Sequence, residues 1–255
     1  MAFFRRLTPS RSIAILVSAL ACLLTAVPLA AQDRGTIVEK LDVAMRSATF
    51  VIEFNTSADL APFARDFARN IATAFESLPA NVANASRIGF VLSRAGTREQ
   101  WQFELIKPMP VKDAMRALAD AATSDVFDDR DTKTWPHLDA LYIAQHAYPW
   151  AETPLQKRVI ISWLNDDAYP KTIGVRAPSV PSGIDAAASG RDLKTDNITV
   201  IAVETRPSGS KQAQRLFETV TEASSGTFID WGKGGEDLAA RITGAIAAQL
   251  SSSRR

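Results

Sequence analysis

The chain has 255 residues, of which 46% are hydrophobic and 22% charged, and its formal net charge is +1. A balanced charge without a basic stripe argues against nucleic acid or an anionic membrane as the partner. The single cysteine, Cys22, lies in the N-terminal segment. Thiol catalysis, Fe–S clusters and cysteine-based zinc sites are therefore excluded for residues 32–255.

Residues 1–31 have the pattern of a secretory signal peptide. Three arginines precede an apolar run over residues 13–24, and small residues follow at 28–31. The run is shorter than the roughly 20 apolar residues that a membrane span needs, although an uncleaved anchor is the alternative. We therefore expect a periplasmic or secreted protein with no membrane span after cleavage, in which residues 32–255 form a single domain.

Apolar strands and amphipathic helices alternate along the rest of the chain. A long stretch, residues 165–196, contains several prolines and glycines without clear periodicity, and it is predicted to be a loop. The predicted strands cover residues 49–52, 88–93, 100–105, 158–164, 198–203 and 227–229, and the predicted helices cover 35–47, 61–78, 211–223 and 238–250, with further helices beginning at Pro110 and near Pro136.

This order of elements predicts a doubly wound α/β fold. Continuous apolar strands separated by amphipathic helices indicate a mostly parallel sheet with helices on both faces. The hairpin joining residues 88–93 to 100–105 supplies one antiparallel edge strand. In such sheets ligands bind beyond the carboxyl ends of the strands, so the site is expected there.

Oxygen-bearing side chains cluster at that predicted edge. Glu53, Asn55 and Ser57 follow the first strand at spacings of two, which points them to the same side. Residues 131–134, which offer a carboxylate and hydroxyl groups, precede a predicted helix, and Asn165, Asp166 and Asp167 directly follow another strand. Together these residues predict an octahedral site for Mg²⁺, or for Mn²⁺ or Ca²⁺. The alternative is that Asn55 and Ser57 cap the next helix while Glu53 pairs with a neighbouring base.

Several of these segments, in this order, resemble the von Willebrand factor type A family. The family's first strand ends in Asp-x-Ser-x-Ser, which is similar to Glu53-x-Asn55-x-Ser57. The resemblance implies a metal-ion-dependent adhesion site whose cation accepts a partner's carboxylate, with Thr134 and Asp166 as further ligands. Glu53 and Asn55 depart from the family's residue types, so the implied site is degenerate. The other similar segments are 87–93, 139–141, 165–167, 198–203, 216–223 and 225–228.

The surroundings of this site suggest contacts for a partner. Trp135 and Trp150 flank a predicted helix, and aromatic residues are enriched at interfaces. We predict that Trp135, His137 and Asp167 contact the partner. For His137 the alternative is a surface or helix-start histidine without a role in binding. His137 and His146 lie nine residues apart, too far to share one metal on a helix face.

The favoured function is non-enzymatic: an exported recognition or scaffolding domain that binds a protein partner. Its predicted surface comprises residues 53–57, 132–137 and 165–170, and the loop at 165–196 shapes specificity. The rival hypothesis is a periplasmic hydrolase that uses Glu53 or Asp166, against which stands the absence of a Gly-x-Ser-x-Gly elbow. A structural envelope component without a discrete site is a third alternative.

Overall fold

A computed structural model defines the fold of most of the chain. The residues that it describes all lie within one compact unit, residues 43–255. The predicted signal peptide and nearly all of the helix predicted at residues 35–47 lie outside the described residues. The described ranges are 47–56, 60–95, 101–123, 134–150, 156–164, 167–175, 179–204, 211–231 and 237–251.

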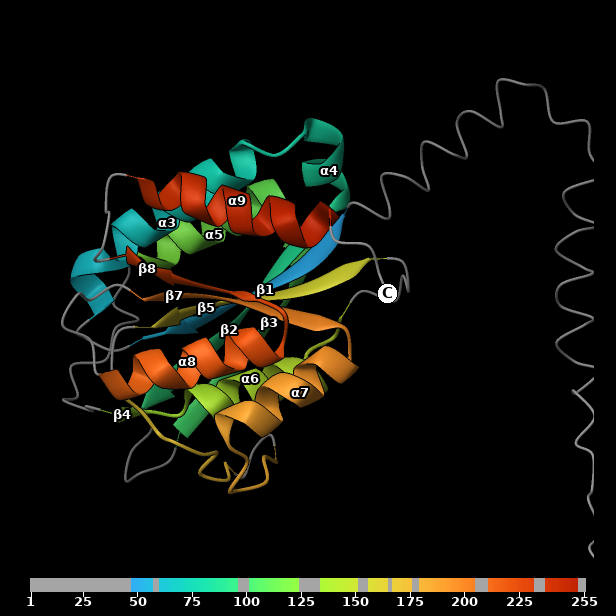
Figure 1. The fold of residues 1–255 in the computed structure, drawn as a ribbon. Helices are drawn as coiled ribbons and strands as arrows, with labels where there is room; N and C mark the ends of the chain where they lie inside the picture. Colours follow the sequence, from blue (N-terminus) through green and yellow to red (C-terminus); the bar gives the residue numbers. More distant parts are fainter. Residues whose placement is uncertain are drawn as a thin grey trace, which may run out of the picture. The chain divides into compact units, whose positions relative to one another are not determined.

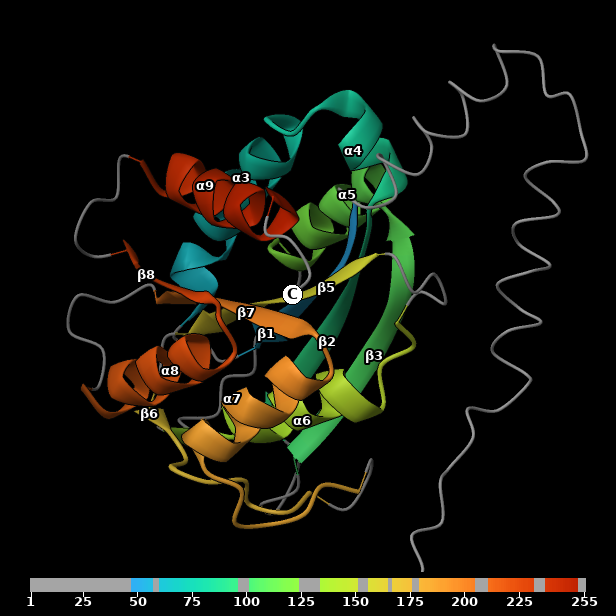
Figure 2. The same ribbon diagram turned by 45° about the vertical axis from the view of Figure 1, so that its right-hand side comes forward.

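In the described residues the main strands form a six-stranded sheet in the order β3-β2-β1-β5-β7-β8 (Figures 1 and 2). The ladder between β2 and β3 is antiparallel, and the other four ladders of this sheet are parallel. In chain order this is the 3-2-1-4-5-6 arrangement of doubly wound sheets, so the predicted fold class is confirmed. The strands are β1 (Ala48–Asn55), β2 (Arg87–Ala95), β3 (Trp101–Pro110), β5 (Lys157–Leu164), β7 (Ile198–Glu204) and β8 (Thr227–Asp230).

Helices cover both faces of the sheet (Figure 1). The upper layer in that view contains α3 (Ala61–Glu76), α4 (Ala80–Ala85), α5 (Val111–Ala121) and α9 (Leu238–Ser251), and the lower layer contains α6 (His137–His146), α7 (Ala186–Thr195) and α8 (Lys211–Ala223).

The central strand β1 shows how its side chains are divided between the two layers. Phe50, Ile52 and Phe54 belong to the core under α3, α5 and α9, whereas Val51 belongs to the core over α6, α7 and α8. This is the alternation that an extended strand imposes. All eight residues of β1 are buried, as expected for a central strand of a doubly covered sheet.

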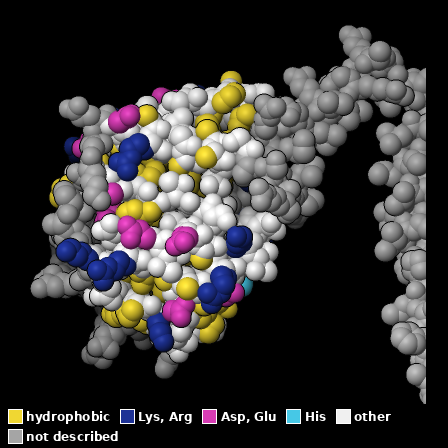
Figure 3. All heavy atoms as spheres, in the orientation of Figure 1, with side chains coloured by type: hydrophobic (Ala, Val, Ile, Leu, Met, Phe, Trp, Pro, Cys, Tyr) yellow, Lys and Arg dark blue, Asp and Glu magenta, His cyan; other side chains and the backbone are white. Residues whose placement is uncertain are grey.

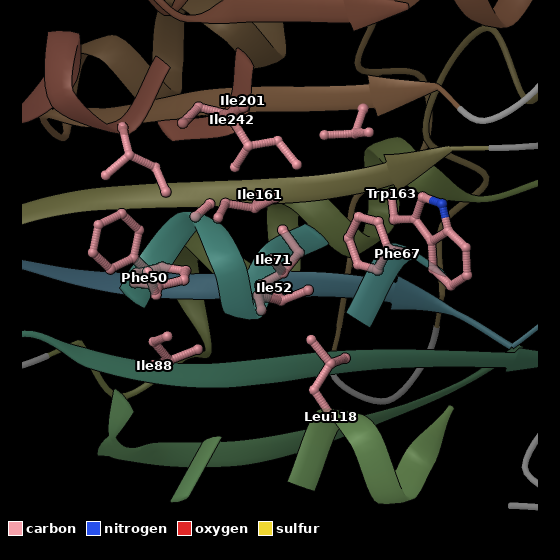
Figure 4. Close-up of a cluster of buried hydrophobic side chains, with 14 of the residues drawn as sticks. Phe50, Ile52, Phe67, Ile71, Ile88, Leu118, Ile161, Trp163, Ile201 and Ile242 are labelled. Atoms are coloured by element: carbon pink, nitrogen blue, oxygen red, sulfur yellow. The ribbon is translucent and has the colours of Figure 1, made fainter. Parts of the chain in front are cut away.

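Aromatic side chains fill much of the upper core. Phe67 of α3 stacks on Trp163 of β5, with ring centroids 4.3 Å apart and planes 2° apart (Figure 4). Phe50 meets Phe75 edge to face at 4.8 Å. These pairs add packing energy to the area that they bury, and they fix α3 on the sheet.

The prediction of a loop over residues 165–196 is wrong for its last third, because α7 occupies Ala186–Thr195. Asp185 caps this helix by accepting a hydrogen bond of 2.8 Å from the backbone N–H of Ala188. The helix is short and rich in small residues, so its apolar face carries little periodicity. Small residues on its apolar face let the helix approach α8 closely at Gly190.

No described helix combines the length and apolar character needed to cross a membrane. On the face shown in Figure 3, basic and acidic side chains are interspersed over the surface. Among the described residues, Ile173 is the large hydrophobic side chain that is exposed, at 37%.

Candidate functional site

A band of buried polar side chains crosses the lower face of the sheet near the carboxyl ends of the strands. Strand alternation places these residues on the same face as Val51, the face that α6, α7 and α8 cover. Each is at most 4% exposed. We call them the polar band: Glu53 and Asn55 of β1, Ser93 of β2, Ser162 of β5 and Glu204 of β7.

Glu53 is the centre of the polar band. Its side chain is fully buried, and Oε1 lies 3.1 Å from Nδ1 of His137. Oε2 accepts a hydrogen bond from the Ser162 hydroxyl, and Glu53 and Ser162 face each other in the ladder between β1 and β5. Both carboxylate oxygens therefore have a partner inside the protein. A buried carboxylate is costly unless it is paired in this way.

His137 is the first residue of α6, and its side chain is only 1% exposed. A surface position is wrong, because the ring is buried between Glu53 and Phe217 of α8, but the position at a helix start agrees with the alternative. The ring centroids of His137 and Phe217 lie 5.5 Å apart with planes at 90°. Within the described part of the chain, Nε2 of His137 is buried and has no hydrogen-bond partner.

A second, two-stranded ladder brings the start of α6 beside the segment that follows β5. Strand β4 (Thr134–Trp135) pairs with β6 (Asp167–Ala168), so that Thr134 faces Asp167. The backbone N–H of Tyr169 also donates to the Trp135 carbonyl at 3.1 Å. Two segments that the sequence analysis assigned to the site are thus adjacent.

Two of the predicted site residues have different surroundings from those expected. Trp135 is fully buried, so its side chain offers no free surface, and its prediction as a contact for a partner is wrong. His137 is buried as well, so its predicted direct contact is also wrong. Thr134 is half-buried, and nothing is described of the Asp167 side chain.

Strand β1 ends in two polar residues held against β2. Asn55 is fully buried and faces Ser93 in the parallel ladder. Thr56 donates both its backbone N–H and its hydroxyl to the Ser93 carbonyl, at 3.1 and 3.0 Å. Ser57 and Asp166, the remaining predicted ligands, lie outside the described residues.

Sequence reasoning missed Asp139 of α6, which is fully buried. Its carboxylate accepts backbone hydrogen bonds from Ile173 at 3.0 Å and Gly174 at 3.2 Å. Burial raises the pKa of Asp139 above its usual range, while backbone hydrogen bonds from Ile173, Gly174 and Val175 act in the opposite direction. The available signal was an acidic residue inside the otherwise apolar first turns of a helix.

Ser162 was also missed, although it is the polar interruption of a strongly apolar strand, Lys157–Leu164. Such an interruption at a central strand is a signal for a buried polar contact, because a buried hydroxyl requires a partner. The identity of that partner follows only from the pairing of β1 with β5.

The described residues do not fit a cation site with Glu53 as a direct ligand. A hard cation binds oxygen ligands that it can reach, whereas the Glu53 side chain has no exposed surface and both of its oxygens already contact groups within the protein. Within the described ranges, no group of three or more His, Cys, Asp or Glu side chains is placed to hold a metal ion.

Comparison with known proteins identifies the fold but no close relative. Neither protein-family models nor curated protein sequences match the chain. Among solved structures, the pilus adhesin SpaC from Lactobacillus rhamnosus GG aligns with TM-score 0.54 and 11% identity, over 80% of this chain and 30% of that chain. Proximal thread matrix protein 1 from the mussel byssus aligns with TM-score 0.53 and 13% identity, over 80% and 48%.

A second structure of the mussel protein, with a zinc-occupied MIDAS motif, aligns at TM-score 0.50 and 10% identity, over 78% of this chain and 46% of that chain. That motif is the metal-ion-dependent adhesion site implied by the sequence resemblance. The chain has a von Willebrand factor type A fold. At these identities the likeness concerns the fold alone, and the chain spans less than half the length of the structures that it matches. In this type A fold the polar band lies at the carboxyl ends of the central strands.

Proposed function

We propose that this chain is an exported, non-enzymatic recognition domain that binds a protein partner at the carboxyl edge of its sheet. The observation that carries the proposal is the buried cluster of Glu53, His137 and Ser162 beneath that edge. Along the chain, His137 lies 84 positions from Glu53 and Ser162 lies 109 positions from it. The cluster joins β1, β5 and the start of α6. The predicted surface, residues 53–57, 132–137 and 165–170, adjoins these three elements.

A buried cluster of ionisable side chains costs free energy at a position where apolar side chains could fill the core. Most of the lower core is apolar, and a buried ionisable pair stabilises a protein no better than well-packed apolar side chains. Buried ionisable groups at the strand ends of a doubly wound sheet mark a candidate binding region. We therefore infer that the cluster positions the surface above it for recognition.

Export is supported by the signal-peptide pattern in residues 1–31 and by the character of the structural neighbours. One neighbour is a pilus adhesin and the other is a byssus matrix protein. The activities of those proteins belong to chains that extend well beyond the matched region. For this chain they support partner binding only as a class of function.

The proposal is tested by photo-crosslinking the full chain in its native envelope extract, followed by measurement of affinity for the captured protein. Thr134→Arg, which places a bulky charge at the edge, is expected to reduce that affinity at least tenfold. Lys112→Ala, in α5 of the opposite layer, is the matched control and should leave the affinity unchanged. Equal affinity of the Thr134→Arg variant and the wild type would place the interface elsewhere.

The rival hypothesis of a hydrolase is separated by assays with ester, phosphate and peptide substrates. We expect no turnover above that of the Glu53→Gln and Asp166→Ala variants. Turnover by the wild type that both substitutions abolish would contradict a non-enzymatic function.

A cation-mediated version of the same recognition is favoured by one observation, the zinc-occupied motif in the mussel protein. In this chain the residues left to hold such a cation are Asn55, Ser57, Thr134 and Asp166. Isothermal titration of the full chain with Mg²⁺, Mn²⁺, Ca²⁺ and Zn²⁺ tests this version. Heat that saturates at one cation per chain, and is lost in Asp166→Ala, would establish it.

A further inference from the structure

We infer that His137 takes the place of a cation at Glu53, so that the carboxyl edge of this type A fold is organised without a metal ion bound to that carboxylate. The inference concerns the free protein and goes beyond the proposed function. It therefore stands or fails independently of whether a partner binds at the edge.

The first argument is that the surroundings of the Glu53 carboxylate are complete. One oxygen lies 3.1 Å from His137 Nδ1, and the other accepts the Ser162 hydroxyl. The side chain has no exposed surface. A cation could reach this carboxylate only if the packing around it opened, which would weaken its hydrogen bonds to buried partners. Leaving a buried donor unpaired costs free energy.

The second argument is that the His137 ring is held in place from several directions. His137 is the first residue of α6 and closely follows strand β4, which is paired with β6. Phe217 of α8 packs against the ring at 90°, with the centroids 5.5 Å apart. The ring cannot leave Glu53 without losing its contact with Phe217. The histidine is therefore a fixed part of the cluster, and it uses Nδ1 while Nε2 remains unpartnered among the described residues.

The third argument explains why this position holds Glu where the family pattern has Asp. The Glu53 carboxylate must reach across the ladder to Ser162 and also down to the first residue of α6. The additional methylene of glutamate supplies that reach, because it extends the carboxylate further from the strand than aspartate does. The glutamate at position 53 and the histidine at position 137 thus belong to the same change, in which contacts within the protein replace contacts with a cation.

The test is thermal unfolding of the full chain in EDTA and in millimolar Mg²⁺, Mn²⁺, Ca²⁺ or Zn²⁺. We expect the change in Tm that each cation produces, if any, to agree between the wild type and Glu53→Gln within 1 °C, which corresponds to a few tenths of a kcal/mol in a domain of this size. A cation-dependent rise of the wild-type Tm that Glu53→Gln abolishes would overturn the inference.

The contribution of the histidine is tested by His137→Gln. Removing one member of a buried pair is expected to lower the Tm by roughly 10 °C for a domain of this size. The matched control is His146→Gln at the other end of α6, whose ring lies against Tyr142, and its Tm should change little. Equal Tm values for the two variants would overturn the inference.

A spectroscopic measurement on the wild type keeps the test decisive if His137→Gln does not fold. Nitrogen-15 NMR distinguishes a protonated from an unprotonated ring nitrogen. We expect Nδ1 of His137 to be protonated in metal-free buffer and to stay so when Mg²⁺ or Zn²⁺ is added. An unprotonated Nδ1, or a change at this nitrogen on adding the cation, would show that the histidine does not occupy the Glu53 carboxylate.

Discussion

The Asp139 carboxylate accepts a hydrogen bond of 3.2 Å from the backbone N–H of Gly174, which lies 35 positions later in the chain. A second bond, from the Ile173 N–H at 3.0 Å, makes the carboxylate a double acceptor for the same loop. Gly174 has a φ of +85°, a conformation that other residues rarely adopt, so the backbone there can turn both amides toward α6. One buried side chain therefore fixes the loop between β6 and α7 onto α6.

The effect of pH on stability follows from the direction of the Asp139 pKa. Because burial raises this pKa in the folded state, the folded protein binds a proton more readily than the unfolded chain between the ordinary Asp pKa and the raised value. The stability that Asp139 contributes is therefore fully present below the ordinary pKa, and it is lost as the pH rises through the raised pKa. Urea unfolding of the wild type and of Asp139→Asn across pH 3 to 8 measures this contribution as the difference between the two proteins.

We expect the advantage of the wild type over Asp139→Asn, in free energy of unfolding, to shrink as the pH rises and then to become constant. The asparagine serves as the control because it does not titrate in this range. An advantage that grows with pH would mean that the backbone hydrogen bonds outweigh burial and that the pKa is lowered.

Much of the fold could be predicted because its strands and helices have strong local patterns. The strand Lys157–Leu164 is almost continuously apolar, as expected of a strand covered on both faces. The helix Ala186–Thr195 could not be predicted this way, since its packing depends on a close approach to α8 and not on a broad apolar stripe. Close approach is a property of the partner helix as much as of its own sequence.

The candidate site shows the same division. The sequence predicted that Glu53, Ser57, Thr134 and Asp166 would meet at one edge, and this stays a prediction because Ser57 and Asp166 lie outside the described residues. The structure brings Glu53 together with Ser162 of β5 and His137 of α6. The alternative that Glu53 pairs with a neighbouring base agrees with its contact with His137, but the sequence identified neither that base nor the second contact, with Ser162. That outcome depends on which side chains face each other across ladders and helix starts, which no local pattern encodes.

Two helical glycines are expected to respond to alanine with opposite signs. A Cβ at Gly190 of α7 would lie 2.6 Å from the Ala223 Cβ and 2.8 Å from the Val220 carbonyl oxygen, so Gly190→Ala must push α7 away from α8. We expect a loss of about 1–3 kcal/mol in the free energy of unfolding. At Gly244 of α9 a Cβ would meet no atom within 4 Å, so Gly244→Ala should gain about 0.5–1 kcal/mol from lower backbone entropy in the unfolded chain.

Chemical denaturation of both variants measures this contrast, and each variant is the control for the other. If Gly190→Ala were as stable as Gly244→Ala, the close contact between α7 and α8 would be wrong.

Lys157 of β5 stabilises the end of α9, a helix of the upper layer. Its Nζ donates hydrogen bonds to the Gln249 and Leu250 carbonyls in the last turn of α9, at 2.6 and 2.7 Å. A cation at this end both satisfies free carbonyl groups and opposes the negative end of the helix dipole. We expect Lys157→Met to lower the free energy of unfolding by about 1–2 kcal/mol.

The control for this substitution is Lys194→Met, an exposed lysine in the last turn of α7. It removes an equal charge and should change stability by less than about 0.5 kcal/mol. Urea unfolding gives both values, and hydrogen exchange at the last amides of α9 should become faster in Lys157→Met alone. Equal effects of the two variants would show that only net charge is involved.

Gly89 leaves the space that the hydroxyl group of Tyr148 occupies. The Tyr148 hydroxyl donates to the Ile106 carbonyl of β3 at 2.9 Å, and burial raises the pKa of Tyr148, so the phenol remains a neutral donor. A Cβ at Gly89 would lie 1.5 Å from that hydroxyl oxygen and 2.5 Å from the Ile106 carbonyl oxygen. The glycine is therefore required for the hydroxyl to reach the edge strand.

A double-mutant cycle tests this relationship. Tyr148→Phe should cost about 0.5–1.5 kcal/mol in unfolding free energy, because it removes one hydrogen bond and no apolar area. Gly89→Ala should cost more than Tyr148→Phe, because the new methyl group collides with both the hydroxyl and the backbone of β3. In the double variant the collision with the hydroxyl is gone, but the collisions with the Ile106 carbonyl and with Cζ of the ring, at 2.7 Å, remain. The combined loss should therefore be smaller than the sum of the single losses yet larger than that of Tyr148→Phe alone. Strict additivity would show that the ring and the glycine do not share this space.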